Sequence, residues 1–573
     1  MSKYQTLFGE FHLPDQDAKK LSFCGTKPRQ LQSWLDDLAT TQVKQVSIVL
    51  YKLLPEVNHL AITGSQRLGL MSILRPYVHH CISGLAEDFL KQPLSLTENM
   101  TKIAAIAQAL QRHLCDGYMI TIRQILQADK LSSTASYELS LALYYATHGL
   151  SQLLYRSYQL YVPRPPMLWS KLHQLYKIAE EQKLNRNVIP DELLESSQGL
   201  SNQQAYLRAV LLSCSHNNQL RQVDIQYLYM ALEKWSPMVS LQPAKNIDKH
   251  IYWLDSGSDE GPFYQSRYKA DSNEVPNNGL YALNLNTLTE LLSSTNTNND
   301  AVSDIPIHLR QSLIAHLKTC WKQEHSRSQP RQQSKLDLEI CIGLKAAHQQ
   351  LLGDTTFDDF LKQKSKTLDS GIIVDGSPMD ISENGTFTNR ISAVGNANYD
   401  SQPRQGDFAI VTATDISEQG YCLRWSGPVP PQIKSGEIIL LKKPNTEHWQ
   451  AGAIRWAQRL NKHTYIGVQI LEGYAKASAA STTLQNGDAT PFFRTVLLIN
   501  ENTTNDVAAS GHLKNGEGKT VDSAEISSLI TPTIPFAPQQ KIQLQTEDDY
   551  QEAKLHDLLL SSGSISQYSY QSL

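Results

Sequence analysis

The most informative part of the sequence is residues 408–425, FAIVTATDISEQGYCLRW. Two apolar runs, Phe408–Val411 and Tyr421–Trp425, predict β-strands. Between them lies a D-x-S-x-x-G motif at a strand end, formed by Asp415, Ser417 and Gly420. An ionised aspartate only accepts hydrogen bonds, so it can receive the N1–H and N2–H of a guanine edge, and a serine hydroxyl can donate to an oxygen. Glycine permits a tight turn and a close ligand approach.

The predicted strands continue on both sides of this motif. Leu336–Ile342 alternates apolar and polar residues, which is typical of a half-buried strand. Further apolar runs follow the motif and are separated by Gly, Pro and Asn turns: Ile438–Leu441, Gly452–Trp456 and Tyr465–Leu471. Closely spaced strands with short turns predict a small antiparallel barrel. Residues 353–406 are rich in Ser, Asp, Asn and Gly and predict a flexible insertion in it.

A second motif precedes the first strand of this predicted barrel. It is an R-x-x-x-R sequence formed by Arg327 and Arg331, with Pro330 stiffening the segment between them. Each guanidinium is planar and permanently charged, and its fork of donors can grip a phosphate through two parallel hydrogen bonds. It can also pair with guanine O6 and N7 or stack on the base.

The two motifs together, in this order, resemble the PilZ family. The later strands add to the resemblance, because Gly452–Trp456 and Tyr465–Ile470 are similar to the family's G-x-V-x-W and I-G-V-x-F patterns. The match covers Arg327–Leu471. The resemblance implies that the ligand is the bacterial messenger cyclic di-GMP. It also implies that Arg327 and Arg331 hold phosphates and guanine faces, that Asp415 and Ser417 read a guanine edge, and that Gly420 shapes the turn.

A second D-x-S-x-x-G sequence exists, at Asp380–Gly385 within the predicted insertion. No long β-pattern follows it, whereas Asp415 is followed by the remaining strands of the barrel. We therefore assign the ligand site to the later copy, because a motif match has value only in its structural context.

The other regions of the chain have different patterns. Residues 1–250 predict helix after helix, with capping boxes at Ser95–Glu98 and Ser201–Gln204 and a break at Pro163–Pro166. This half is similar to that of uncharacterised PilZ-containing proteins of gammaproteobacteria. A connecting segment, residues 251–322, contains a helix at 307–321, the barrel covers 323–475, and residues 476–573 predict a small β extension. The fold class is thus multidomain α+β, with an irregular all-α N-terminal domain and a PilZ-like antiparallel β-barrel.

Composition excludes several classes of function. The net charge of −4 gives no electrostatic support for DNA or RNA binding. The seven cysteines form no C-x-x-C pair, which argues against zinc or redox sites and suits reduced thiols in the cytoplasm. We find no signal peptide and no apolar run of transmembrane length. No catalytic or metal-binding motif is present, so we expect neither an enzyme nor a cofactor.

The expected function is that of a regulatory adaptor. Cyclic di-GMP bound at the barrel would alter the arrangement of the helical domain, which would contact an unknown protein partner. The alternative is a scaffold for protein–protein interaction whose barrel binds no nucleotide.

Overall fold

The computed structural model divides the chain into two compact units, Met1–Ser326 and Arg327–Leu573. It describes residue 8 and residues 11–573 except the following: 39–41, 91–93, 95, 129, 195–198, 245–250, 269–278, 295–301, 304, 323–331, 363–407, 428, 447, 461–462, 485–487, 500–527, 548 and 563. The boundaries expected at residues 250, 322 and 475 stay predictions.

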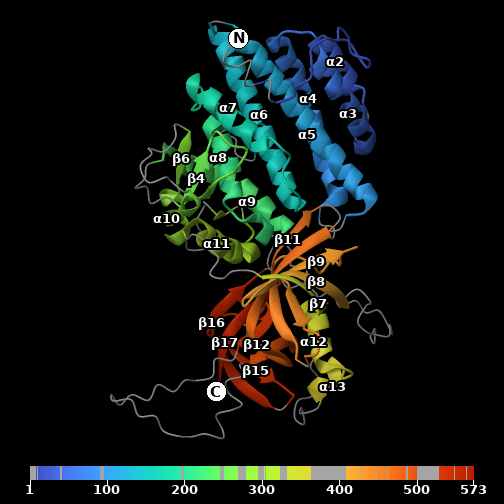
Figure 1. The fold of residues 1–573 in the computed structure, drawn as a ribbon, viewed down its shortest axis with the longest axis vertical. Coiled ribbons are helices and arrows are strands. Elements are labelled where there is room, and N and C mark those ends of the chain that lie inside the picture. Colours follow the sequence, from blue (N-terminus) through green and yellow to red (C-terminus); the bar gives the residue numbers. More distant parts are fainter. Residues whose placement is uncertain are drawn as a thin grey trace. The chain divides into compact units, whose positions relative to one another are not determined.

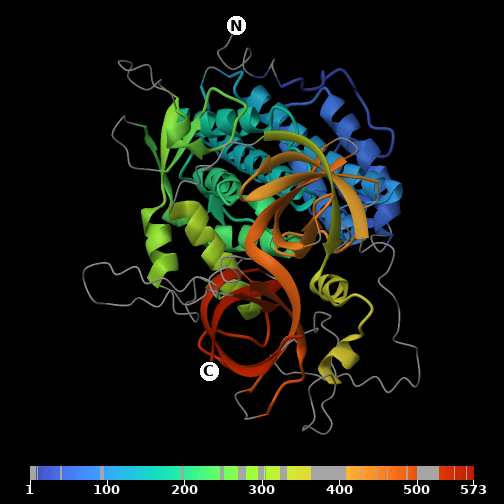
Figure 2. The same ribbon diagram turned by 60° about the horizontal axis from the view of Figure 1, so that its bottom comes forward.

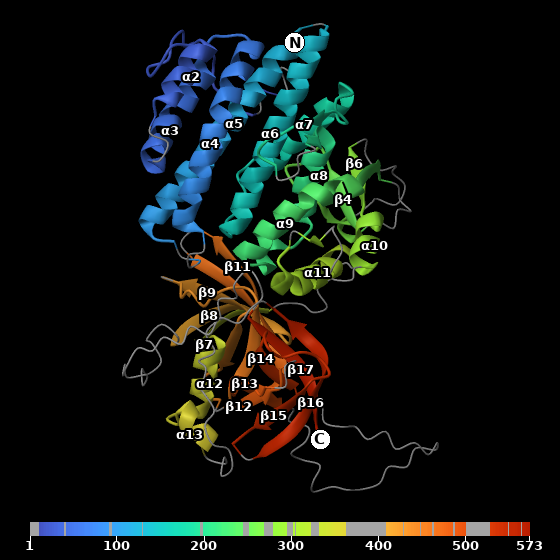
Figure 3. The same ribbon diagram turned by 180° about the vertical axis from the view of Figure 1, so that it is seen from behind.

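The first unit is built mainly from helices, as expected (Figures 1 and 3). Their bounds are α2 (Pro28–Asp36), α3 (Val43–His59), α4 (Gly64–Phe89), α5 (Glu98–Ile125), α6 (Ser133–Gln159), α7 (Leu168–Glu181), α8 (Asn202–Ser213) and α9 (Gln222–Trp235). A short ribbon, β1 (Val188–Ile189) with β2 (Leu200–Ser201), precedes α8. One continuous apolar cluster runs from Phe8 to Trp321, so the helices share a single core.

The two predicted helix starts differ in outcome. At α8 the capping box is confirmed, because the Gln204 backbone N–H donates to Ser201 Oγ (3.2 Å) and the Ser201 N–H donates to Gln204 Oε1 (2.8 Å). The box expected at Ser95 is wrong. Helix α5 begins later, at Glu98, and its N-cap is Thr97, whose hydroxyl accepts from the Met100 N–H.

The region expected to connect the domains is part of the core of the first unit. A four-stranded sheet has the order β3-β6-β4-β5, and helices α10 and α11 follow it. The bounds are β3 (Ser240–Pro243), β4 (Tyr252–Asp255), β5 (Phe263–Tyr264), β6 (Leu280–Asn284), α10 (Asn286–Ser294) and α11 (Ile307–Lys322). The buried Tyr252 hydroxyl lies 3.1 Å from the carbonyl oxygens of both Cys214 and Cys320, which ties the sheet to α8 and α11.

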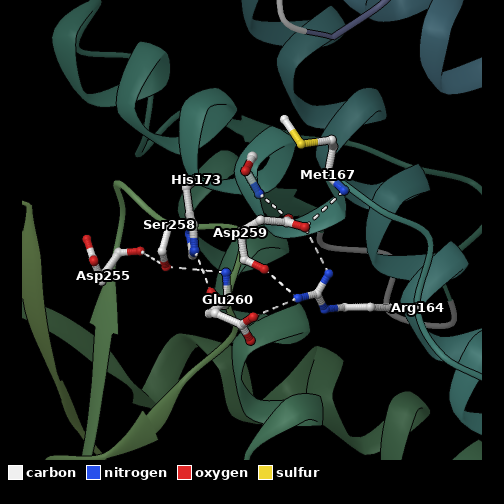
Figure 4. Close-up of polar contacts among 8 residues, drawn as sticks. Arg164, Met167, His173, Asp255, Ser258, Asp259 and Glu260 are labelled. Carbon is white, nitrogen blue, oxygen red and sulfur yellow. Dashed lines mark hydrogen bonds and ion pairs between the residues drawn. The ribbon is translucent and has the colours of Figure 1, made fainter.

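The loop between β4 and β5 is anchored on the start of α7 (Figure 4). The Asp259 carboxylate accepts hydrogen bonds from the Met167 and Ser170 backbone N–H groups, each at 3.0 Å, and from Arg164 at 3.0 Å. Burial alone would raise the pKa of Asp259. These donors and the Arg164 charge have a larger combined effect, so the pKa is lower than its ordinary value. A carboxylate at a helix N-terminus stabilises exposed backbone donors, so this contact fixes the loop.

The second unit begins with the expected antiparallel barrel. Its strands are β7 (Gln332–Ile342), β8 (Phe408–Ser417), β9 (Gly420–Ser426), β10 (Ile438–Lys442), β11 (Gln450–Leu460) and β12 (His463–Thr482). They pair in the order β11-β10-β7-β8-β9-β12, and the pairing of β11 with β12 closes the ring. Inward side chains such as Leu338, Ala413 and Leu423 are fully buried.

The expected β extension forms a second closed barrel, which Figure 2 shows as a ring of red strands. Its strands are the end of β12 together with β13 (Phe493–Ile499), β14 (Ser528–Pro532), β15 (Lys541–Gln545), β16 (Tyr550–Ser561) and β17 (Ile565–Ser572). Pairing of β12 with both β13 and β15 closes it. The 20-residue strand β12 therefore belongs to both barrels.

Two short helices cover the shared strand. These are α12 (Leu344–Leu352) and α13 (Phe357–Lys362), and α13 lies within the predicted insertion. They pack on the small side chains of Ala477 and Ala479. The rest of that insertion, from residue 363 to 406, lies outside the described residues. None of the helices in the described parts of the chain is long and apolar enough to cross a membrane.

Candidate functional site

The D-x-S-x-x-G motif forms the hairpin that joins β8 to β9. Ser417 pairs with Gly420, and Glu418 and Gln419 form the connecting turn. The Ser417 hydroxyl donates to the Gly420 carbonyl oxygen at 3.3 Å. The motif therefore lies at a strand end, as the sequence indicates.

A β-bulge determines the direction of the Asp415 side chain. Ala413 pairs with Leu423, but Asp415 pairs with the next residue, Cys422, so Thr414 is an extra residue in β8. Residues directly opposite each other share one face of the sheet. Ala413 and Leu423 face the barrel interior. The register therefore places Asp415 and Cys422 on the opposite, outer face of the sheet, where Cys422 is still buried. The Thr414 hydroxyl secures the bulge by donating to the Cys422 carbonyl oxygen at 3.1 Å.

Asp415 is available for a ligand in this arrangement. Its side chain is half-buried, and it makes no hydrogen bond or ion pair with any residue that the structure describes. A carboxylate without a partner offers acceptor sites for N–H donors.

An aromatic ring lies further along the same outward row of residues. The row runs across four strand pairs: Gln333, Asp415, Cys422, Gly467 and Trp456 are successive cross-strand partners. The indole of Trp456 lies over Gly467, because any Cβ atom at residue 467 would overlap with it. The sequence analysis did not assign Trp456 to the site. Its pairing with a glycine is the relevant signal, and only the strand register reveals that pairing.

Gly420 is required by its neighbour strand. A Cβ atom at this residue would overlap with the Val468 carbonyl oxygen of β12. The Ile470 N–H also donates to the Gln419 carbonyl oxygen at 2.9 Å, so the hairpin is held against β12. In the structure, Gly420 thus permits a close approach of the Val468 backbone. This contact fixes the turn that carries Ser417.

A hollow of about 380 Å³ is lined by Thr414, the chain neighbour of Asp415. Its lining comes from three neighbouring strands: Ser334, Lys335 and Asp337 of β7, Thr412 and Thr414 of β8, and Arg424 of β9. Sequence reasoning did not select these residues. In the sequence, Cys422 and Arg424 alternate with the apolar residues of β9. This alternation could have indicated that Arg424 lies on the outer face of the barrel.

The remaining predicted site residues, Arg327 and Arg331, lie outside the described residues, as does the second motif copy at Asp380–Gly385. Their role stays a prediction. The described chain resumes at Gln332, which pairs with Ile416, and Gln333 pairs with Asp415. The residue that follows Arg331 in the chain is therefore next to the D-x-S-x-x-G strand.

Family models match three successive parts of the chain. They are described as the N-terminal domain of the cyclic-di-GMP receptor FimW (residues 29–245), its middle PilZ domain (251–477) and its C-terminal β-barrel domain (522–573). The chain contains a PilZ domain. The PilZ match includes the whole first barrel and the D-x-S-x-x-G hairpin, in agreement with the resemblance noted from the motifs.

A curated relative resembles nearly the whole chain. It is the cyclic-di-GMP receptor FimW of Pseudomonas aeruginosa, which is 28% identical over 590 residues, covering 98% of this chain and 93% of the relative. No solved structure matches the chain. The similarity thus extends beyond the PilZ domain to the helical unit and to the second barrel.

Proposed function

We propose that this protein is a cyclic di-GMP-binding regulator and that the ligand binds on the outer face of the first barrel. The observation that carries the proposal is the outward, unpaired carboxylate of Asp415 beside Ser417, within a PilZ-family barrel. The relative that covers almost the whole chain is a cyclic-di-GMP receptor, which supports the same ligand.

Each part of the site has a defined role in this proposal. Asp415 accepts N1–H and N2–H of one guanine, and Ser417 donates to an oxygen of the ligand. The Trp456 indole, in the same outward row, offers a surface on which a base stacks. Arg327 and Arg331 grip phosphate oxygens and guanine faces with their guanidinium forks. These tasks are binding tasks, so the proposed protein is a receptor and not an enzyme.

Ligand binding would then act on the segment between the two units. Residues 323–331 contain both arginines and join α11 to β7. We propose that arginine–ligand contacts restrict this segment and so change the arrangement of the helical unit, which contacts a protein partner. A ligand shifts such an equilibrium only through its different affinities for the two arrangements. Small-angle scattering with and without cyclic di-GMP measures the shift, and identical curves at saturation would exclude this mechanism.

Calorimetric titration of the full chain with cyclic di-GMP tests the binding site. Wild-type protein should bind, and Arg327→Ala and Arg331→Ala should each lose affinity by on the order of tenfold or more, because each removes charge-assisted hydrogen bonds. Lys541→Ala, in an exposed position on the second barrel, is the matched control and should bind like wild type. Absence of binding by the wild type would instead support the alternative, a scaffold that binds no nucleotide. Undiminished affinity in both arginine variants would refute the site assignment.

A further inference from the structure

The hollow near Asp415 is lined by two cations, Lys335 and Arg424, and one carboxylate, Asp337. Lys335 and Arg424 are both exposed and form no ion pair or hydrogen bond with the described residues. The third charged residue in the lining, Asp337, accepts a hydrogen bond from the Thr412 hydroxyl at 2.9 Å. The lining therefore has an excess positive charge in a protein whose net charge is −4.

The strand register places this charge within reach of a ligand held by Asp415. Arg424 pairs with Thr412, and Cys422, two residues before it on β9, pairs with Asp415. Two residues along a strand span about 7 Å, so Arg424 occupies the next outward position after the Asp415 row. Lys335 and Ser334 approach from the other side, where a bulge in β7 lies opposite Thr414.

Three side chains of the hollow are free to donate hydrogen bonds: Lys335, Arg424 and Ser334. Arginine offers a planar fork of N–H groups and lysine offers an ammonium with three donors. The Ser334 hydroxyl accepts from the Leu336 N–H at 3.1 Å, which leaves its own proton free to donate. The hydroxyl protons of Thr412 and Thr414 are already donated, to Asp337 and to the Cys422 carbonyl oxygen. Donors and positive charge around a small hollow suit a phosphate group.

We propose that Lys335, Arg424 and Ser334 form a phosphate subsite next to the guanine-reading carboxylate of Asp415. This inference rests on the proposed function, because we take the phosphate to be one of the two in cyclic di-GMP. The subsite contributes its own contacts to a phosphate, separate from those of Arg327 and Arg331. The affinity for cyclic di-GMP therefore depends on both sets of residues. The subsite also favours a ligand whose phosphate and guanine are separated by about 7 Å, the length of two residues along a strand.

The test compares four variants of the full chain by calorimetric titration with cyclic di-GMP. Arg424→Gln and Lys335→Gln should each weaken binding by on the order of tenfold, as expected for loss of a charged hydrogen-bond donor. Arg424→Lys should restore part of the affinity, because it keeps the charge but loses the fork. Lys443→Gln removes an exposed charge from the same barrel, outside the hollow, and should change affinity less than twofold.

A second arm uses pyrophosphate, which carries no base. It should raise the Tm of wild type and of Asp415→Asn, but not that of Arg424→Gln. If wild type binds cyclic di-GMP and Arg424→Gln behaves like Lys443→Gln, the subsite is refuted while the proposed function stands. If cyclic di-GMP does not bind but pyrophosphate stabilises only proteins with Arg424, the proposed function fails and an anion site remains. Failure of both ligands to act on the wild type overturns both proposals.

Discussion

The indole of Trp456 lies over Gly467, its direct partner on the neighbouring strand β12. The same outward row continues through Cys422 to Asp415, so an aromatic surface and a free carboxylate lie on one face of the first barrel. This row connects strands β7, β8, β9, β12 and β11, of which β8 with β9 and β11 with β12 are consecutive in sequence and the other pairs are far apart.

Asp415→Asn should weaken cyclic di-GMP binding by about tenfold to a hundredfold. The amide keeps the size of the side chain, but it replaces a charged acceptor with a neutral group that carries a donor. Calorimetric titration measures the change. Asp557→Asn, an exposed aspartate on β16, is the control. Equal affinities for the two variants would remove Asp415 from the site.

Gly467→Ala should displace the Trp456 ring. A methyl group at this residue would overlap with the indole, so we expect a loss of about 1–3 kcal/mol in unfolding free energy from overpacking. Tryptophan near-UV circular dichroism and a cyclic di-GMP titration should both change. Gly69→Ala in α4 is the control, because no atom lies within 4 Å of its Cβ position and alanine favours helix. Unchanged spectra for Gly467→Ala would contradict this packing.

The barrels should lose stability in acid through His348. Burial and the Arg494 charge lower the pKa of this histidine to about 3, although its contact with the Ser478 carbonyl oxygen (2.9 Å) acts in the opposite direction. The ordinary pKa is about 6.5, so between these values the unfolded chain binds a proton that the folded chain excludes. Unfolding free energy should therefore fall by about 1.4 kcal/mol per pH unit as pH drops through this range.

His348→Gln should reduce this acid sensitivity, because glutamine can still donate to Ser478 but does not titrate. Hydrogen exchange of β12 peptides at pH 7 and pH 5, compared between the variant and wild type at each pH, measures the effect. Wild type should lose protection relative to the variant at the lower pH. The same relative protection at both pH values would show that His348 does not control acid stability.

Asp259→Asn should loosen the loop that joins β4 to β5. The asparagine oxygen still accepts one hydrogen bond, but the charge next to Arg164 and the start of α7 is lost, which costs about 1 kcal/mol. Hydrogen exchange in the first turn of α7 should increase. Glu260→Gln is the control, because Glu260 pairs with the same arginine but is 76% exposed. A larger effect from Glu260→Gln than from Asp259→Asn would contradict this assignment.

Strand predictions succeeded where the polar and apolar residues alternate and failed where the strand is irregular. Leu336–Ile342 and Tyr421–Trp425 fall within β7 and β9. Strand β16, however, was not anticipated, and its register with β17 shifts between Leu555 and Leu558 and again before Leu560. Such shifts break the two-residue period that identifies a strand in sequence. Helix α12 was also missed, because its few turns give a short pattern.

From the sequence alone, Asp415 and Ser417 were predicted as ligand-binding residues, and the type of barrel that carries them was predicted with them. Asp415, Ser417 and the alternating strands around them are local patterns, and local patterns are readable without coordinates. The tertiary structure alone decided that β12 closes two barrels and that Asp415 faces outward. Barrel closure depends on pairing between strands distant in sequence. The direction of Asp415 depends on the bulge at Thr414, which exists only relative to the residues opposite it on β9.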